Sequence, residues 1–180
     1  DWLPYRVFDP APRLYKNARS KGFILSAAPL IGADERTGEI LGQFFSEGMP
    51  EGACLQILHH ASPRIGRVVA PWFAKRYAQG GVYEAMARHR SKRLYDLVWE
   101  SGSAHAPFHA RCHNLVISLG VPDTANVDDN ELAQCRDGLI GVLTSLGIDA
   151  NEMEPQELIA LVDDLTSPTT APQEDRAEYN

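Results

Sequence analysis

The amino-acid sequence predicts an α+β fold, with a mainly antiparallel sheet, helices packed on one face, and a helical insertion between two strand–helix–strand units. The first observation is the order of the periodic segments: a strand–helix–strand pattern occurs twice, and two consecutive helices separate the copies. The second is size and composition, because 180 residues that are 44% hydrophobic suffice to bury one ordinary core. We therefore expect one globular domain over residues 1–166 and a flexible linker over residues 167–180.

The first third of the chain contains strand signals and one helix signal. Two prolines two apart divide residues 3–16 into two short extended pieces around a turn. Residues 21–28 alternate between two faces, which predicts a strand. Asp34 can cap a helix over residues 35–47. Its apolar stripe is Ile40, Leu41, Phe44 and Phe45. Residues 53–60 are short and apolar, and we interpret them as a central strand.

Two helices are predicted in the middle of the chain. Ser62 is placed to be an N-cap, with Pro63 at the first helical position. The following buried face is Ile65, Val68, Val69, Trp72, Phe73 and Tyr77. Pro71 interrupts this stripe, so we expect a kink or a restart there. After two glycines, a second helix is predicted over residues 82–100. Its inward residues are Tyr83, Met86, Leu94, Leu97 and Val98.

The last third returns to a strand and two helices. Residues 111–119 alternate in hydrophobicity and predict a strand. Asp128 begins a helix, with Glu131 at the capping-box position, and Gly147 ends that helix. Pro155 opens a final helix, with room for a short strand before it.

Composition restricts the function classes. No run approaches the roughly 18 apolar residues that a membrane-spanning helix needs, and no secretory leader pattern follows Asp1. Because the chain opens without Met, we expect a trimmed chain or an internal fragment. Its cysteines, Cys54, Cys112 and Cys135, are odd in number and lack a CxxC spacing. A reducing compartment therefore explains them better than a disulfide framework does.

Charge is segregated along the chain, although the net charge is only −7. Residues 64–93 hold eight Lys or Arg against one acid, which gives +7, whereas residues 121–180 hold fourteen acids against two Arg, which gives −12. A protein with a basic middle and an acidic end can dock directionally.

Nucleotide chemistry has no motif to support it. A phosphate-binding loop needs Gly-x-x-x-x-Gly-Lys-Ser/Thr, because backbone amides cradle the phosphates while the lysine neutralises them. The four lysines of this chain follow Tyr, Ser, Ala and Ser, never Gly. We therefore expect no catalytic residues, no cofactor and no small-molecule substrate for this chain.

One cluster of metal-binding residue types is present: His105, His109, Cys112 and His113. Pro107 lies between the two first histidines, so they do not share a regular helical face. Adjacent residues of a strand point to opposite sides, which separates Cys112 from His113. These four are weak candidates, and we expect loop and strand-edge histidines rather than a metal site.

The basic segment 64–93 has three interpretations: a solvated helix face, a docking surface for protein or phospholipid headgroups, and an independent nucleic-acid-binding module. The chain's overall acidity argues against the third. The candidate docking residues are Arg88, Arg90, Lys92 and Arg93. Helical spacing places Arg88 and Lys92 on one stripe, and Arg90 and Arg93 on another.

Three strings carry a family resemblance that extends over residues 5–165. The first is Gly22-Phe23-Ile24-Leu25-Ser26-Ala27-Ala28-Pro29-Leu30-Ile31-Gly32-Ala33-Asp34. The second is Pro50-Glu51-Gly52 leading to Leu55-Gln56 and Ala61-Ser62-Pro63. The third is Val82-Tyr83 with Ala87-Arg88-His89-Arg90, followed by Pro107-Phe108-His109-Ala110-Arg111. By these strings the chain resembles the amino-terminal domain of the TraC-type ATPases of F-like conjugative type IV secretion systems.

The resemblance implies a function that the residues alone do not. Members of that family sit in the bacterial cytoplasm at the inner-membrane base of the conjugation channel, and their Walker motifs lie in a separate carboxy-terminal motor domain. For this chain, the resemblance implies a non-catalytic domain that docks an ATPase to inner-membrane channel components during conjugative DNA transfer or pilus assembly. The implied partners are other type IV secretion proteins, the motor domain and neighbouring subunits, on a plasmid or integrative element.

The missing Gly-Lys dipeptide generates a test. We expect the purified chain to show no ATP turnover above buffer and no magnesium-dependent nucleotide binding, because nothing would hold the phosphates. A coupled phosphate-release assay measures this, and turnover that disappears on mutation of a residue in this chain would contradict it.

Overall fold

A computed structural model describes residues 3–105, 107–167 and 172. The chain divides into two compact units, each built from two separate stretches of sequence. The first unit comprises residues 1–60 and 114–155, and the second comprises residues 61–113 and 156–180. The prediction of a linker over residues 167–180 lies almost entirely outside the described residues.

A six-stranded sheet forms the first unit, in the order β1-β2-β3-β5-β4, with β6 also paired to β3. Its strands are β1 (Tyr5–Asp9), β2 (Leu14–Asn17), β3 (Ser20–Ala27), β4 (Cys54–Ser62), β5 (Cys112–Pro122) and β6 (Ala150–Glu152). The pairs β1–β2, β2–β3, β3–β5 and β3–β6 are antiparallel. The predicted α+β class is confirmed, including a helical insertion between β4 and β5.

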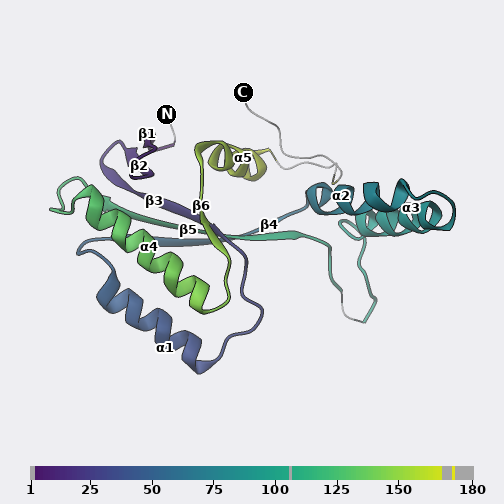
Figure 1. Cartoon of the computed structure of the whole chain (residues 1–180), viewed down its shortest axis with the longest axis horizontal. Coiled ribbons are helices and arrows are strands. Elements are labelled where there is room, and N and C mark those ends of the chain that lie inside the picture. The colour runs from purple at the N-terminus through teal and green to yellow at the C-terminus, as the bar shows by residue number, and fades with distance from the viewer. Residues whose placement is uncertain (1–2, 106, 168–171, 173–180) are drawn as a thin grey trace. The chain divides into compact units, whose positions relative to one another are not determined.

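The main core lies between the sheet and α4 (Asp129–Ser145), which crosses one face of the sheet (Figure 1). Strands β3 and β5 pair over their shared length, so Phe23 lies opposite Leu119 and Leu25 opposite Ile117. Alternate residues of both strands therefore face α4, as period-2 side-chain placement requires. The facing helix residues are Leu132, Cys135, Leu139 and Leu143, at spacings of three and four.

Capping residues fix where the helices of this unit begin. Asp128 accepts a hydrogen bond from the Glu131 amide at 2.7 Å, and Asp34 accepts one from the Thr37 amide at 2.8 Å. The hydroxyl of Thr37, more than the amide, holds the pKa of Asp34 below its usual value. The helix after Asp34 is α1 (Glu35–Gln43), which continues as a π-helical turn, η1 (Phe44–Gly48).

Two arginines pair with Glu152 of β6, and one of them belongs to α4. Buried Arg136 of α4 lies 2.9 Å from Glu152 of β6, and its guanidinium also donates to the Pro12 carbonyl oxygen. Arg13 shares Glu152 at 3.1 Å and pairs with Glu154. Because the buried guanidinium has carboxylate and carbonyl partners, the cost of its burial is offset.

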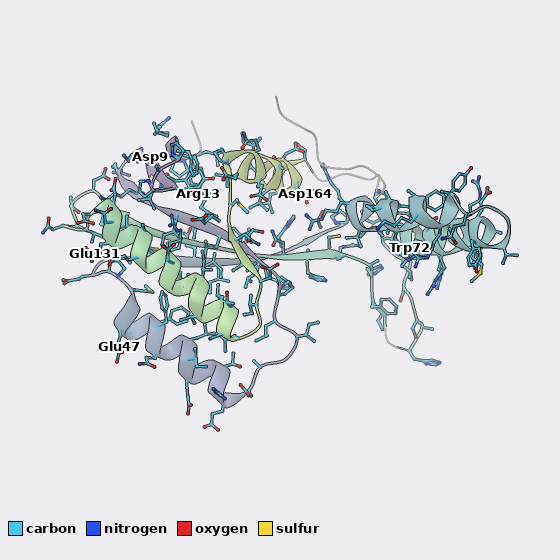
Figure 2. All side chains as sticks on the ribbon, viewed as in Figure 1. Asp9, Arg13, Glu47, Trp72, Glu131 and Asp164 are labelled. Carbon is cyan, nitrogen blue, oxygen red and sulfur yellow. The ribbon has the colours of Figure 1, made fainter. Side chains whose placement is uncertain are left out.

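The second unit contains α2 (Gly66–Tyr77), α3 (Gly81–Asp96) and α5 (Pro155–Thr166). A small cluster of Ile65, Val69 and Val98 forms its core. Asp164 of α5, labelled in Figure 2, has a side chain only 1% exposed and lies 2.9 Å from Arg64 Nε. This ion pair joins α5 to the segment that precedes α2.

Two local expectations were wrong. Residues 53–60 were predicted as a central strand, but β4 is at the end of the sheet order. The Ser62 hydroxyl accepts from the Arg64 amide at 3.1 Å and caps no helix, because α2 begins only at Gly66. Of the kink or restart expected at Pro71, the restart does not occur, since α2 includes this residue. An apolar run reports burial potential, whereas strand position depends on pairing partners distant in sequence.

The stripe predicted on the first helix is only partly buried. Phe44 is 8% exposed and packs in the main core, whereas Phe45 is 40% exposed. The switch to a π-helical turn after Gln43 shifts the side chains that follow relative to a regular helical stripe.

Gly22 and Gly120 are opposite each other on β3 and β5, yet they differ in the space beside them. A Cβ on Gly22 would overlap the carbonyl oxygen of Leu119, whereas a Cβ on Gly120 would meet only the Lys21 oxygen at 3.7 Å. We expect Gly22→Ala to destabilise the first unit by about 1–3 kcal/mol or more through overpacking, and Gly120→Ala to stay within about 1 kcal/mol of the native protein. Urea unfolding, monitored by circular dichroism, gives the free energy of unfolding of each variant. Equal losses of stability in the two variants would contradict this close approach.

The Arg64–Asp164 pair gives a second matched test. Asp164→Asn removes the buried negative charge and leaves a guanidinium that is 11% exposed with the more distant and more exposed Asp163, so we expect a loss of about 3 kcal/mol. Asp163 lies 3.5 Å from the same arginine but is 24% exposed, so Asp163→Asn should cost less than about 1 kcal/mol. In a Trp2→Phe background, the fluorescence of Trp72 and Trp99 follows unfolding of this unit. Equal stability of the two variants would show that the buried pair contributes little.

Candidate docking site on a helical hairpin

Helices α2 and α3 form a hairpin around a short turn (Figure 1). Gly80 and Gly81 adopt positive φ angles of 69° and 54°, which a residue with a Cβ rarely adopts. The double glycine in the sequence therefore reverses the chain between the two helices.

The hairpin buries few of its own side chains. In α3 only Ala87 and Ser91 are buried, and α2 buries only Gly66 and Val69. Tyr83 and Met86 were predicted to point inward, but they are 61% and 56% exposed. Helical spacing correctly groups residues on one face, but whether another element covers that face depends on the tertiary fold.

An apolar groove of about 440 Å³ lies along the hairpin. It is lined by Val68, Val69 and Trp72 from α2, and by His89, Arg90, Arg93 and Leu94 from α3. Val69 is 5% exposed, whereas Val68 and Leu94 are 62% and 37% exposed. The groove thus presents apolar surface to solvent beside two arginines.

Cation–π contacts order the arginines of the hairpin. Arg76 lies 4.4 Å and Arg90 5.8 Å from the centroid of the Trp72 ring, which Figure 2 labels. Arg88 stacks on Tyr77 at 4.7 Å and donates to its hydroxyl oxygen at 2.9 Å. Each such contact contributes about 0.5–1 kcal/mol at an exposed site, and together they hold the guanidinium groups in place.

Two of the four predicted docking residues pair with acids of their own helix. Arg88 lies 3.0 Å from Glu84, and Lys92 lies 2.7 Å from Asp96, both at the i,i+4 spacing. The hydrogen bond from Lys92 to the Asp96 carboxylate raises the pKa of that ammonium above its usual value. Their positive charges are therefore largely compensated within the hairpin.

The other two candidates differ. Arg90 and Arg93 both line the groove, and neither forms a salt bridge within the described ranges 3–105 and 107–167. The structure thus divides the four predicted residues into a compensated pair, Arg88 and Lys92, and a groove pair, Arg90 and Arg93. Their role in docking stays a prediction.

Sequence reasoning missed the aromatic part of this site. We expected Trp72 and Phe73 to be buried with Ile65 and Val69, but only the latter two are fully buried. Trp72 instead forms one wall of the groove beneath two arginines. The i,i+4 spacing of Trp72 and Arg76 was a usable signal, whereas the Arg90 contact depends on how α2 and α3 pack.

The four candidate metal ligands lie in different environments. His105, His109 and His113 are exposed, while Cys112 packs against the Ile65–Val69–Val98 cluster. Across the described part of the chain, no three His, Cys, Asp or Glu residues are grouped so that they could hold a metal ion.

Among the described residues, no helix combines the length and hydropathy that crossing a membrane requires.

Comparison with known proteins identifies the family. No curated protein and no solved structure matches the chain. A family model described as TraC protein matches residues 1–180, the full length of the sequence. Because this match covers the strands, the core helix and the hairpin alike, the chain belongs to the TraC family of type IV secretion proteins.

Proposed function

We propose that this chain is a non-catalytic amino-terminal domain of a conjugative type IV secretion ATPase, which docks the motor to inner-membrane channel components and contributes to subunit assembly. Family membership provides the role in type IV secretion and conjugation. Docking, assembly and a cytoplasmic position peripheral to the inner membrane are the further steps of the proposal.

The observation that carries the docking role is the groove of the α2–α3 hairpin, with its apolar wall and the groove pair Arg90 and Arg93. Exposed apolar surface beside ordered charge is typical of an interaction site. Arginine and tryptophan are also the residue types most enriched among energetically dominant interface contacts.

The chemistry of the groove defines its partner. An amphipathic segment of a channel protein would place apolar side chains on Val68, Trp72 and Leu94, and carboxylates on the groove pair. Burial of the apolar contacts would supply most of the binding free energy, while the charge pairs would set orientation and association rate.

Charge compensation reduces the number of cations that segment 64–93 could offer to nucleic acid. Arg64 is held by Asp163 and Asp164, and Arg88 and Lys92 are held by Glu84 and Asp96. To bind phosphate, these cations would have to give up their carboxylate partners, and this cost lowers the binding free energy gained from each phosphate contact.

The groove pair provides the experiment. The tagged chain would capture inner-membrane channel proteins from detergent extracts of conjugating cells, and captured proteins would be quantified by mass spectrometry. We expect Arg90→Gln with Arg93→Gln to reduce capture at least about tenfold, because both uncompensated charges at the groove are removed.

Arg88→Gln with Lys92→Gln is the matched control, because it removes the same charge from the same helix. It should leave capture within about threefold and cost only about 0.3–0.5 kcal/mol per helical pair. An equal loss of capture in both double variants would show that the net charge of the helix, and not the groove pair, determines capture. DNA binding with a steep salt dependence would favour the nucleic-acid alternative instead.

A further inference from the structure

A cavity of about 360 Å³ lies against the sheet of the first unit, on the face that α4 does not cover. Gly22 of β3 and Gly120 of β5 are opposite each other in the register, and both line this cavity. They alternate with Phe23 and Leu119, which belong to the core beside α4, so the two glycines belong to the other face. Two neighbouring strands therefore lack a side chain at the same point, and the sheet has a hollow there.

Two tyrosines form a wall of this glycine-floored cavity. Tyr15 of β2 pairs with Gly22 in the register, and its hydroxyl donates to the Met153 carbonyl oxygen at 2.9 Å, which fixes the ring. Tyr5 packs edge-on against Tyr15, with ring centroids 5.6 Å apart. An aromatic wall beside a flat floor favours a planar ring as ligand. An apolar cavity of about 150 Å³ holds benzene, so this larger cavity has room for two fused rings.

One acceptor in the cavity wall has no donor. The side-chain nitrogen of Asn17 donates to the Ser20 hydroxyl oxygen at 3.0 Å, whereas the Asn17 Oδ1 atom is buried and receives a hydrogen bond from none of the described residues. A buried acceptor without a donor destabilises the protein, and nearly all such atoms in native structures have a partner. A ligand with one N–H group would supply that partner.

The cavity is also uncharged. Asp, Glu, Lys and Arg make up 23% of the chain, yet none of them is among the described residues that line the cavity. A nucleotide or a free amino acid would bring ionised groups to a site without a counter-charge, and their desolvation would oppose binding. A tryptophan side chain within a peptide is uncharged and planar, and its indole is a hydrogen-bond donor only.

We propose that this cavity recognises a tryptophan side chain of a partner protein, with the indole on the Gly22–Gly120 floor and its N–H group donating to Asn17 Oδ1. Buried tryptophans are among the contacts that dominate the energetics of interfaces. The site is separate from the hairpin groove, because its lining residues belong to the first unit and the groove lies in the second.

Titration of the ¹⁵N-labelled 180-residue chain with N-acetyl-L-tryptophanamide, followed by two-dimensional NMR, tests the site. We expect saturable shifts of the Gly22 and Gly120 amide signals, with a dissociation constant of about 0.1–1 mM for so small a probe. The same probe methylated at the indole nitrogen cannot donate and should bind at least about fivefold more weakly. No saturable shift of these two glycines would overturn the proposal.

A pair of asparagine variants tests the acceptor. Asn17→Ala should abolish the difference in affinity between the two probes, because the group that distinguishes them is gone. Asn114→Ala is the matched control: its side chain pairs with Ser26 on the same sheet and does not line the cavity, so the difference should persist. Discrimination that survives Asn17→Ala would overturn the role of Asn17.

Filling the cavity gives an independent test. A Cβ on Gly120 would meet only the Lys21 oxygen at 3.7 Å, so Gly120→Val should fold, as circular dichroism can verify, while its methyl groups occupy the hollow and weaken probe binding at least about tenfold. Unchanged binding would overturn the site. Free tryptophan binding as tightly as the amide would overturn the selection for a tryptophan within a peptide. Binding only in a Trp2→Ala variant would show that the chain's own tryptophan takes the site, and would overturn a partner. All these variants retain Arg90 and Arg93, so the capture assay decides the docking proposal separately.

Discussion

The structure of the first unit depends on β3. Its one edge pairs with β5 from Ser20 to Ala27, while its other edge is shared by β2 at one end and β6 at the other. The eight residues of β3 therefore fix the positions of three other strands, β2, β5 and β6, which are far from one another in the sequence. The close approach of Gly22 to the Leu119 carbonyl is the tightest constraint in this arrangement, since it leaves no room for a side chain.

The two units use different physical means of stability. The first combines a continuous apolar layer with ion pairs at its periphery, such as Lys21 with Asp129 at 2.6 Å, whose hydrogen bond lowers the pKa of that aspartate. The hairpin of the second unit relies on cation–π stacking and i,i+4 pairs, with few buried side chains. Such a hairpin is marginal as an isolated element, and a partner that covers its groove would stabilise it through binding.

Local patterns predicted most elements and the fold class. The alternation that marks β3 and the cap at Asp128 are properties of neighbouring residues, so sequence alone was sufficient for them. The pairing of Arg88 with Glu84 has the i,i+4 spacing and could have been predicted, but it was missed. The edge position of β4 and the stacking of Arg90 on Trp72 depend on contacts between distant segments. Single-sequence periodicity contains no information about those contacts, and there the predictions were wrong or silent.

The interleaving of the two units has a consequence for how the protein is made. The first unit requires residues up to 155, and the Arg64–Asp164 pair of the second requires a residue 100 positions further along the chain. The sequence of the first unit is complete only at residue 155, and the second unit also needs α5, which follows. Such non-local closure slows folding and prolongs the exposure of unpaired strands. A nascent chain stalled before β6 would carry both units unfinished, and its unpaired strands would be exposed to aggregation or to chaperone binding.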